Sequence, residues 1–232
     1  MASDTPNHFA SPVCPLGENT CSYLTEVVEL RRQLQSLAEQ ARTDALTGLY
    51  NYRYLQEILP LEMERTRRSG HPLAVILLDI DHFKRFNDTW GHELGNQALQ
   101  QVAQQIRLTL RKLDLACRYG GEEFVILLPN TDLRQALGVA ERLRENIANN
   151  PLQTPGEIIP LSASLGVDEF HMRHGDSPEQ LLARVDTWLY QAKKLGRNCV
   201  ASPTPTVDLA AVTTEEKQAL FDIWTDSEDP SS

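Results

Sequence analysis

The sequence predicts an α+β domain whose strands and helices alternate in the ferredoxin-like order βαββαβ, preceded by a helical stalk. Three observations predict this fold. A continuous apolar run of strand length covers residues 73–78, short apolar segments flank Gly120-Gly121, and the stretches between them carry apolar residues at helical spacing. An unbroken apolar run is typical of a strand buried on both faces, so we expect 73–79 at the centre of the sheet.

Length and charge limit the classes of protein to consider. The chain of 232 residues has room for one sizeable core with extensions. Its formal net charge of −10 argues against binding to a nucleic-acid polymer, which relies on clustered Lys and Arg. No apolar run approaches the roughly 20 residues of a membrane span, and the N-terminus lacks the pattern of a signal peptide. We therefore expect a cytoplasmic protein with no membrane span.

Two segments precede the domain. Residues 1–21 are rich in Pro, Ser and Asn and predict a flexible arm. The spacing of Cys14 and Cys21 is not standard for zinc, so we expect solvated thiols, with a metal or redox role as the alternative. Residues 22–42 have apolar side chains at heptad spacing, namely Val27, Leu30, Leu34, Leu37 and Ala41. This pattern favours a parallel coiled coil and a homodimer, and the alternative is a helix packed on its own domain.

The elements of the domain, residues 43–203, follow in order. We expect a helix after Asn51 that ends near Gly70, the strand 73–79, a helix over 95–113, the hairpin, a helix over 133–149, a strand over 160–170 and a helix over 178–195. The tail, residues 204–232, is acidic and rich in Pro and Thr, which predicts disorder. A capping box at 213–216 predicts one short helix within the tail.

The hairpin at Gly120-Gly121 is the first candidate site. Glycine takes positive φ at both positions of a two-residue turn without steric cost, so this pair predicts a tight turn. Without side chains, its tip would let a ligand lie against the main chain, and the carboxylates Glu122 and Glu123 follow at once. The alternative is an ordinary acidic surface turn.

The end of the strand 73–79 is the second candidate site. Asp79 and Asp81 follow with period two, which puts both on the same side, and Glu122 is expected beside them. Carboxylates and the Ile80 carbonyl make a hard-oxygen site of the kind that holds Mg²⁺ with substrate phosphates.

Basic and amide side chains complete the second site. The cations that a triphosphate needs are Lys84, Lys193 and Arg197. Lys193 and Arg197 at a helix end could instead complement the helix dipole. Asn87 offers both a donor and an acceptor to the edge of a base.

Four ordered motifs between residues 43 and 202 resemble the GGDEF family of diguanylate cyclases. They are DALTGLYN (44–51), LDIDHFKRFNDTWGHELGN (78–96), RYGGEEF (118–124) and AKKLGRN (192–198). The resemblance implies a nucleotidyl-cyclase-type fold and an enzyme that condenses two GTP into cyclic di-GMP with Mg²⁺ or Mn²⁺. Each of two domains would hold one GTP, which again implies a homodimer.

The resemblance also implies roles for individual residues. The metal positions are Asp79, Ile80 and Glu122, and Glu123 is the second acid, either as general base or as a second metal ligand. The substrate-binding positions are Lys84, Asn87, His92, Asn96, Gly120, Gly121, Lys193 and Arg197. Arg111 and Asp114, five residues before Gly120, match the product-inhibition site, where an arginine fork suits a guanine edge or a phosphate.

Two features leave the function open in detail. Where the family has an Asp, this chain has Asn96. Asparagine has an NH₂ group in place of one of the two acceptor oxygens of aspartate. This difference predicts weaker selectivity for guanine and some mixed GMP–AMP product. Acceptance of guanine with little loss is the alternative. A different function is a catalytically silent receptor that binds cyclic di-GMP through Arg111 and Asp114. His171 and His174 have metal-like spacing but lie in a polar stretch that predicts a solvated turn.

Overall fold

The structure is a computed structural model that describes residues 26–33, 37, 42–154, 156–173 and 175–204. The expectations for the arm 1–21, with Cys14 and Cys21, and for the tail helix after 213–216 lie outside these residues. No helix in the described part of the chain is long and apolar enough to cross a membrane.

The α+β fold is confirmed, and its centre is a six-stranded sheet in the order β1-β3-β4-β2-β7-β8. The strands are β1 (Tyr50–Asn51), β2 (Leu73–Ile80), β3 (Leu115–Arg118), β4 (Glu123–Pro129), β7 (Ala163–Phe170) and β8 (Val200–Ala201). The inner strands pair antiparallel, and the two-residue strands β1 and β8 add parallel pairs at the edges. The order β3-β4-β2-β7 is that of a ferredoxin-like βαββαβ sheet.

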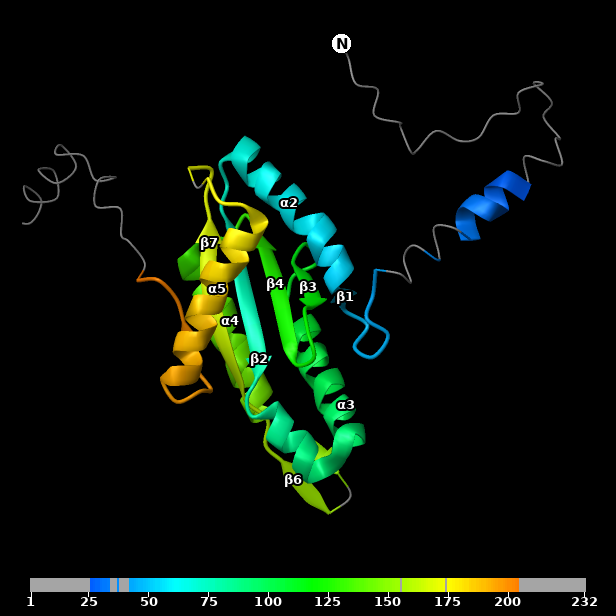
Figure 1. The fold of residues 1–232 in the computed structure, drawn as a ribbon, viewed down its shortest axis with the longest axis vertical. Coiled ribbons are helices and arrows are strands. Elements are labelled where there is room, and N and C mark those ends of the chain that lie inside the picture. The colour runs from blue at the N-terminus through cyan, green and yellow to red at the C-terminus, as the bar shows by residue number, and fades with distance from the viewer. Residues whose placement is uncertain (1–25, 34–36, 38–41, 155, 174, 205–232) are drawn as a thin grey trace, which may run out of the picture. The chain divides into compact units, whose positions relative to one another are not determined.

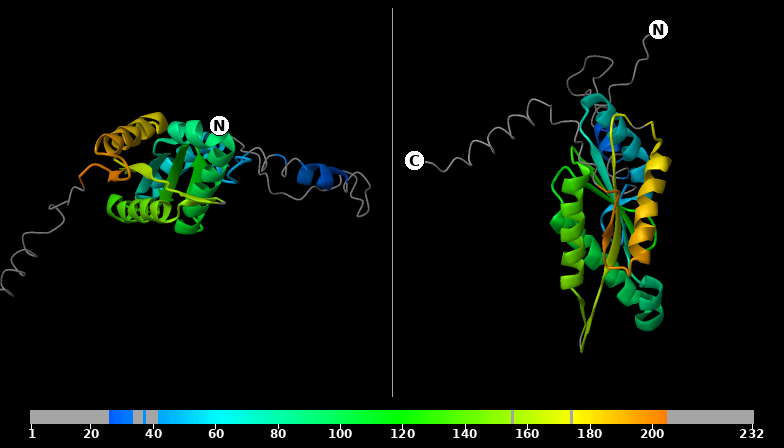
Figure 2. Two further views of the ribbon diagram at one scale, coloured as in Figure 1. Left: turned by 90° about the horizontal axis from the view of Figure 1, so that it is seen from below. Right: turned by 90° about the vertical axis from the view of Figure 1, so that its left-hand side faces the viewer.

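Four helices cover the two faces of this sheet in the region 42–204. They are α2 (Tyr52–Ser69), α3 (Phe83–Thr109), α4 (Leu133–Asn149) and α5 (Pro178–Lys194). Helices α2 and α5 lie on one face, and α3 and α4 lie on the other (Figure 1). Figure 2 shows the sheet edge-on, with α4 and α5 on opposite sides. A separate hairpin of β5 (Leu152–Thr154) and β6 (Glu157–Ile159) lies between α4 and β7 in the sequence.

The central strand β2 is buried on both faces, as its unbroken apolar run predicts. Ala74, Ile76 and Leu78 pack in the cluster that contains α3 and α4. Leu73, Val75 and Leu77 pack in the cluster that contains α2 and α5. Each side chain of β2 thus helps to hold one helical layer, which fixes the end of the strand at Ile80.

Capping residues explain where three of the helices begin. Asn51 accepts a hydrogen bond from the Tyr54 amide at the start of α2. Asp132 with Gln135, and Ser177 with Gln180, form capping boxes at the starts of α4 and α5. The observed bounds of these helices agree with the expected ones to within a residue.

Helix α3 differs from the expected helix over 95–113. It begins at Phe83, bends at Gly91, which has φ 82° and ψ 162°, and ends at Thr109. Phe83, Phe86 and Trp90 lie at helical spacing and would have indicated the first part of this helix, and Leu113 beyond the helix is exposed. The strand expected over 160–170 begins only at Ala163. The strands β1, β5, β6 and β8 have two or three residues, which is too short for any periodicity.

The expected stalk is described only in part. Residues 26–33 and 37 are helical, whereas Leu34 and Ala41 lie outside the described residues. Three of the heptad side chains are exposed, Val27 by 40%, Leu30 by 50% and Leu37 by 60%. The coiled coil therefore stays a prediction.

Candidate active site

The β3–β4 hairpin lies against the carboxyl end of β2. Asp79 pairs with Glu123 in the antiparallel register of β2 and β4. The Ile80 amide donates a hydrogen bond of 3.3 Å to the Glu122 carbonyl. Sheet pairing thus brings Asp79, Ile80, Glu122 and Glu123, which are about 40 residues apart in the sequence, to one edge.

The expected conformation of the Gly-Gly turn was wrong. Neither Gly120 nor Gly121 has positive φ, and residues 119–122 form a longer connection between β3 and β4. Gly120 instead leaves room for the side chain of Glu123. A Cβ on Gly120 would lie 2.8 Å from Glu123 Oε2, whereas a Cβ on Gly121 would meet nothing within 4 Å. Gly121 therefore presents bare backbone to open space, as a ligand surface requires.

Arg118 holds this loop in place through contacts that the sequence did not reveal. Its Nε and Nη2 donate to the Gly121 carbonyl at 3.2 and 2.8 Å. Its Nη1 donates to both carboxylate oxygens of Asp44 at 3.2 Å. Asp44 in turn accepts from the amide and the hydroxyl of the buried Thr47 at 2.8 and 2.6 Å. Because one guanidinium spans Asp44 and Gly121, the loop before α2 fixes the loop that carries Glu122.

Burial is the main influence that raises the pKa of all three carboxylates at this edge. Burial is the largest influence on Asp79, and it raises the pKa even though Lys193 lowers it. Burial followed by the charge of Asp79 raises the pKa of Glu122 and of Glu123. Burial thus disfavours the charged form of each of these carboxylates.

The donor set fits a divalent cation that shares its coordination with a ligand. Lys193 Nζ lies 2.8 Å from Asp79 Oδ2, so an ammonium already neutralises one carboxylate. In the part of the chain that the structure describes, no group of three or more His, Cys, Asp or Glu side chains could hold a metal alone. Two carboxylates and the Ile80 carbonyl match the way Mg²⁺ is bound, because Mg²⁺ keeps positions for water and phosphate.

Asp81 has a different role from the one that its spacing predicts. It accepts hydrogen bonds from the hydroxyls of Ser162 and Ser164, at 2.8 and 2.7 Å, and from the Asn198 amide at 3.0 Å. Its carboxylate oxygens are therefore engaged by β7 and by the loop after α5. That loop contains Arg197, which has φ 63° and whose charge lowers the pKa of Asp79. Asp81 fixes the loop that brings Arg197 toward Asp79.

Helix α3 contributes the amide and basic side chains. Lys84 lies exposed in its first turn, and His92 and Asn96 lie exposed beyond the bend at Gly91. Asn87 Oδ1 is buried and has no hydrogen-bond partner among the described residues. A buried acceptor without a partner costs about 1–3 kcal/mol, which a ligand with an N–H donor would remove.

A comparison with family models decides the classification. The model described as "Diguanylate cyclase, GGDEF domain" matches residues 41–199. The chain belongs to the GGDEF family. The match contains β1 to α5, and with them Asp79, Glu122, Lys193 and Asn87.

Curated relatives of this GGDEF chain include a response regulator and diguanylate cyclases. It is 43% identical over 173 residues to the response regulator PleD of Caulobacter vibrioides, covering 74% of this chain and 38% of that protein. It is 42% identical to the diguanylate cyclase DgcP of Pseudomonas aeruginosa (71% and 24%) and 38% identical to the diguanylate cyclase DosC of Escherichia coli (76% and 39%). The chain thus spans about two fifths or less of each of these relatives.

Solved structures agree with the GGDEF assignment. The coiled coil and GGDEF domain of DgcB from Caulobacter crescentus, in complex with c-di-GMP, has a TM-score of 0.73 and 31% identity. The alignment covers 78% of this chain and 95% of that one. The diguanylate cyclase SiaD with its activator SiaC, from Pseudomonas aeruginosa, has a TM-score of 0.69 and 38% identity, with coverage of 77% and 68%.

Two further motifs of this GGDEF chain lie apart from Asp79. Arg111 and Asp114 form a turn after α3, in which the Arg111 amide donates to Asp114 Oδ2 at 2.8 Å and the Arg111 side chain is exposed. Strand β3 separates this turn from Gly120. His171 Nε2 lies 2.8 Å from Glu169 Oε1 in the loop after β7, and His174 lies outside the described residues.

Proposed function

We propose that this GGDEF chain is a diguanylate cyclase that condenses two GTP into one cyclic di-GMP and two pyrophosphates. Each of two domains holds one GTP, and the 3′-oxygen of one nucleotide attacks the α-phosphorus of the other. In each step a P–O bond to the ribose forms, the bond to pyrophosphate breaks, and the hydroxyl proton passes to a base. The observation that carries this proposal is the convergence of Asp79, Glu122 and Lys193 at the end of β2.

The chain's own residues bind and orient the substrate. Lys84, Lys193 and Arg197 supply positive charge for the triphosphate. The unpartnered Asn87 Oδ1 accepts an N–H of the guanine edge, with His92 and Asn96 near the base, and Gly120 and Gly121 leave room for the phosphates. When bound by Asp79, Ile80 and Glu122, Mg²⁺ or Mn²⁺ neutralises charge on the phosphates.

Glu123 has two roles open to it, general base or second metal ligand. Its pKa is raised by burial, then by Asp79, which moves a carboxylate toward the range in which it accepts a proton near neutral pH. Its Oε2 lies where a side chain on Gly120 would be, so it points along the loop that binds substrate.

The proposal includes a homodimer, feedback by the product and a cytoplasmic location. The exposed heptad residues Val27, Leu30 and Leu37 support a coiled coil, and the related DgcB structure is itself described as a coiled coil with a GGDEF domain. The exposed Arg111 beside Asp114 supports binding of cyclic di-GMP outside the active site. The absence of a membrane-spanning helix from the described residues is compatible with the location.

A second candidate function is a silent receptor for cyclic di-GMP. The exposed Arg111 turn favours this candidate equally, but it leaves the carboxylates of β2 and the hairpin without a role. A third candidate is a cyclase of relaxed purine selectivity, which rests on the exposed Asn96 in place of an Asp.

The deciding experiment is incubation of the full chain with GTP and Mg²⁺, followed by chromatography of the nucleotides. Cyclic di-GMP and pyrophosphate should form, and chelation of the metal should stop the reaction. Glu122→Gln should be inactive, whereas Glu145→Gln, on the exposed surface of α4, should match the wild type. Binding of cyclic di-GMP without turnover would replace this proposal with the receptor.

A further inference from the structure

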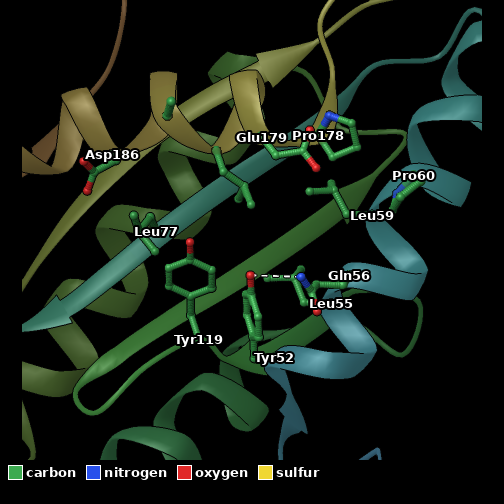
Figure 3. Close-up of a pocket in the computed structure, with 12 residues that line it drawn as sticks. Tyr52, Leu55, Gln56, Leu59, Pro60, Leu77, Tyr119, Pro178, Glu179 and Asp186 are labelled. Atoms are coloured by element: carbon green, nitrogen blue, oxygen red, sulfur yellow. Dashed lines mark hydrogen bonds between the residues drawn. The ribbon is translucent and has the colours of Figure 1, made fainter.

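A cavity of about 580 Å³ lies between α2 and α5, and none of the carboxylates assigned to the active site lines it. Figure 3 shows α2 and α5 as its walls, with the sheet between them. Leu77 of β2 forms part of the floor, Leu55 and Leu59 of α2 line one side, and Leu182 of α5 lines the other. Sites for small organic ligands typically have about 300–1,000 Å³ and apolar walls, so this cavity has the right size and lining.

Two tyrosines form one end of this cavity. The rings of Tyr52 and Tyr119 meet edge to face, with their centroids 5.4 Å apart. The Tyr52 hydroxyl accepts a hydrogen bond of 3.0 Å from Gln56 Nε2 of α2, and the Tyr119 hydroxyl lies between Tyr52 and Leu77 in the view of Figure 3. Exposed aromatic faces at the end of an apolar slot accept flat apolar groups and attract cations.

The charges of the cavity select among ligands. Its lining includes the carboxylates of Glu179 and Asp186 and contains no Lys, Arg or His. Glu179 accepts a hydrogen bond of 2.7 Å from the Ser177 hydroxyl. The exposed carboxylate of Asp186 makes no hydrogen bond or ion pair with the described residues, and alongside burial, which is the largest influence, its charge raises the pKa of Tyr119 and Glu123. A phosphate would be repelled here, which separates this cavity from sites for GTP or cyclic di-GMP.

We propose that this cavity binds a small organic cation with a flat apolar body and a protonated amine. The apolar body would lie between the leucines and the two tyrosine rings, and the ammonium would pair with Asp186. The cation also interacts favourably with the tyrosine faces. The positive charge of this ligand complements the carboxylates of the cavity, so the cavity should prefer it to neutral or anionic ligands of equal size and apolar area.

Tyr119 connects this cavity to the hairpin. It immediately precedes Gly120, and its amide donates a 2.8 Å hydrogen bond to the Glu123 carbonyl. A ligand against the Tyr119 ring therefore contacts the loop that carries Glu122, and its binding should shift the amide resonances of Gly120 and Gly121. This readout does not depend on catalysis, so it can fail or succeed independently of the proposed cyclase activity.

Tryptamine is a suitable probe, with indole-3-acetate as the partner that has the same ring and the opposite charge. Titration of the ¹⁵N-labelled full chain should show saturable shifts at Gly120 and Gly121 with tryptamine, with an affinity at least tenfold higher than for indole-3-acetate. Raising the salt concentration should reduce this ratio. Asp186→Asn should bring the ratio below about threefold.

A cavity-filling variant tests the location. Ala183 is exposed on α5 and lines the cavity, so Ala183→Trp should weaken tryptamine binding at least tenfold. Thr187→Trp, exposed on the same helix and not part of the lining, is the matched control and should bind as the wild type. The proposal is overturned if tryptamine gives no saturable shifts, if indole-3-acetate binds as well, or if Ala183→Trp binds as the wild type with its amide spectrum otherwise intact.

Discussion

Gly95→Ala should separate nucleotide binding from folding. Gly95 lies in α3 beyond the bend, where an added Cβ would be 1.9 Å from Asn87 Oδ1 and 3.0 Å from Asn87 Cγ. Ordinary contacts begin near 3.4 Å, so Oδ1 would have to move by about 1.5 Å. The obstructing atom is the end of a flexible side chain, so Asn87 can rotate away while the backbone stays in place.

Gly95→Ala should weaken GTP binding but should not lower the stability of the fold. Rotation removes the acceptor that we assign to guanine, and one buried hydrogen bond is worth about 1–3 kcal/mol, so the Kd for GTP should rise roughly ten- to hundredfold. Alanine is favoured over glycine inside a helix by about 0.8–1.0 kcal/mol. The thermal midpoint of Gly95→Ala should therefore equal or exceed that of the wild type.

The assay is calorimetric titration with a non-hydrolysable GTP analogue and Mg²⁺, together with thermal denaturation. Gly138→Ala is the matched control, because Gly138 is exposed in α4 and its Cβ would meet nothing within 4 Å. It should raise stability by the same helical preference and leave GTP affinity unchanged. Asn87→Ala should reproduce the loss of affinity without any steric conflict. Wild-type affinity in a folded Gly95→Ala protein would refute the assignment of Asn87 to guanine.

Four other outcomes are expected. Glu122→Gln should abolish synthesis, yet its thermal midpoint at pH 7 should be no lower than that of the wild type. The pKa of Glu122 is raised in the folded state, so its charged carboxylate destabilises the fold as pH rises through that pKa. The difference in midpoint between the variant and the wild type should shrink at pH 4, and a lower midpoint of the variant at pH 7 contradicts the reasoning. Deletion of residues 1–42 should give a largely monomeric enzyme whose specific activity rises with concentration, since a stalk raises the effective concentration of two sites to roughly millimolar; full activity at nanomolar concentration would exclude this. Arg111→Ala should remove product inhibition with the initial rate nearly unchanged, and unaltered inhibition eliminates the site. Asn96→Asp should lower the KM for GTP and remove adenine from the product formed in an equimolar mixture of GTP and ATP. Relaxed selectivity is contradicted if the wild-type product contains no adenine and Asn96→Asp has the same KM for GTP as the wild type.

The sequence predicts those parts of the fold that local patterns encode. The apolar run before Asp79 is long enough to identify a central strand. The helices expected after Asn51 and over 133–149 and 178–195 begin where the structure shows caps at Asn51, Asp132 and Ser177. The same logic locates Asp79 at a strand end and Glu122 at a hairpin, which is why two of the proposed metal ligands could be named before any coordinates.

Long-range side-chain contacts are what local patterns cannot encode. Arg118 contacts Asp44, 74 residues earlier, and Asp81 contacts Asn198, 117 residues later. The alternation of side chains predicts which face of the sheet a residue lies on only within the strand. Strand β2 ends at Ile80, one residue before Asp81, so the alternation does not apply to Asp81. The closeness of Gly120 to the side chain of Glu123 is likewise a contact that no turn rule includes.

The features that oppose stability in this domain gather where the substrate is proposed to bind. Burial raises the pKa of Asp79, Glu122 and Glu123, Asn87 Oδ1 is buried without a partner among the described residues, and Gly121 faces open space. Each of these would be relieved by a different part of one ligand: cation-bound phosphates for the carboxylates, a base N–H for Asn87, and the bulk of the triphosphate for the gap at Gly121. A site maintained only for structure would gain stability from replacing any of them. Their presence in one domain is therefore better explained by a nucleotide with its divalent cation than by folding alone.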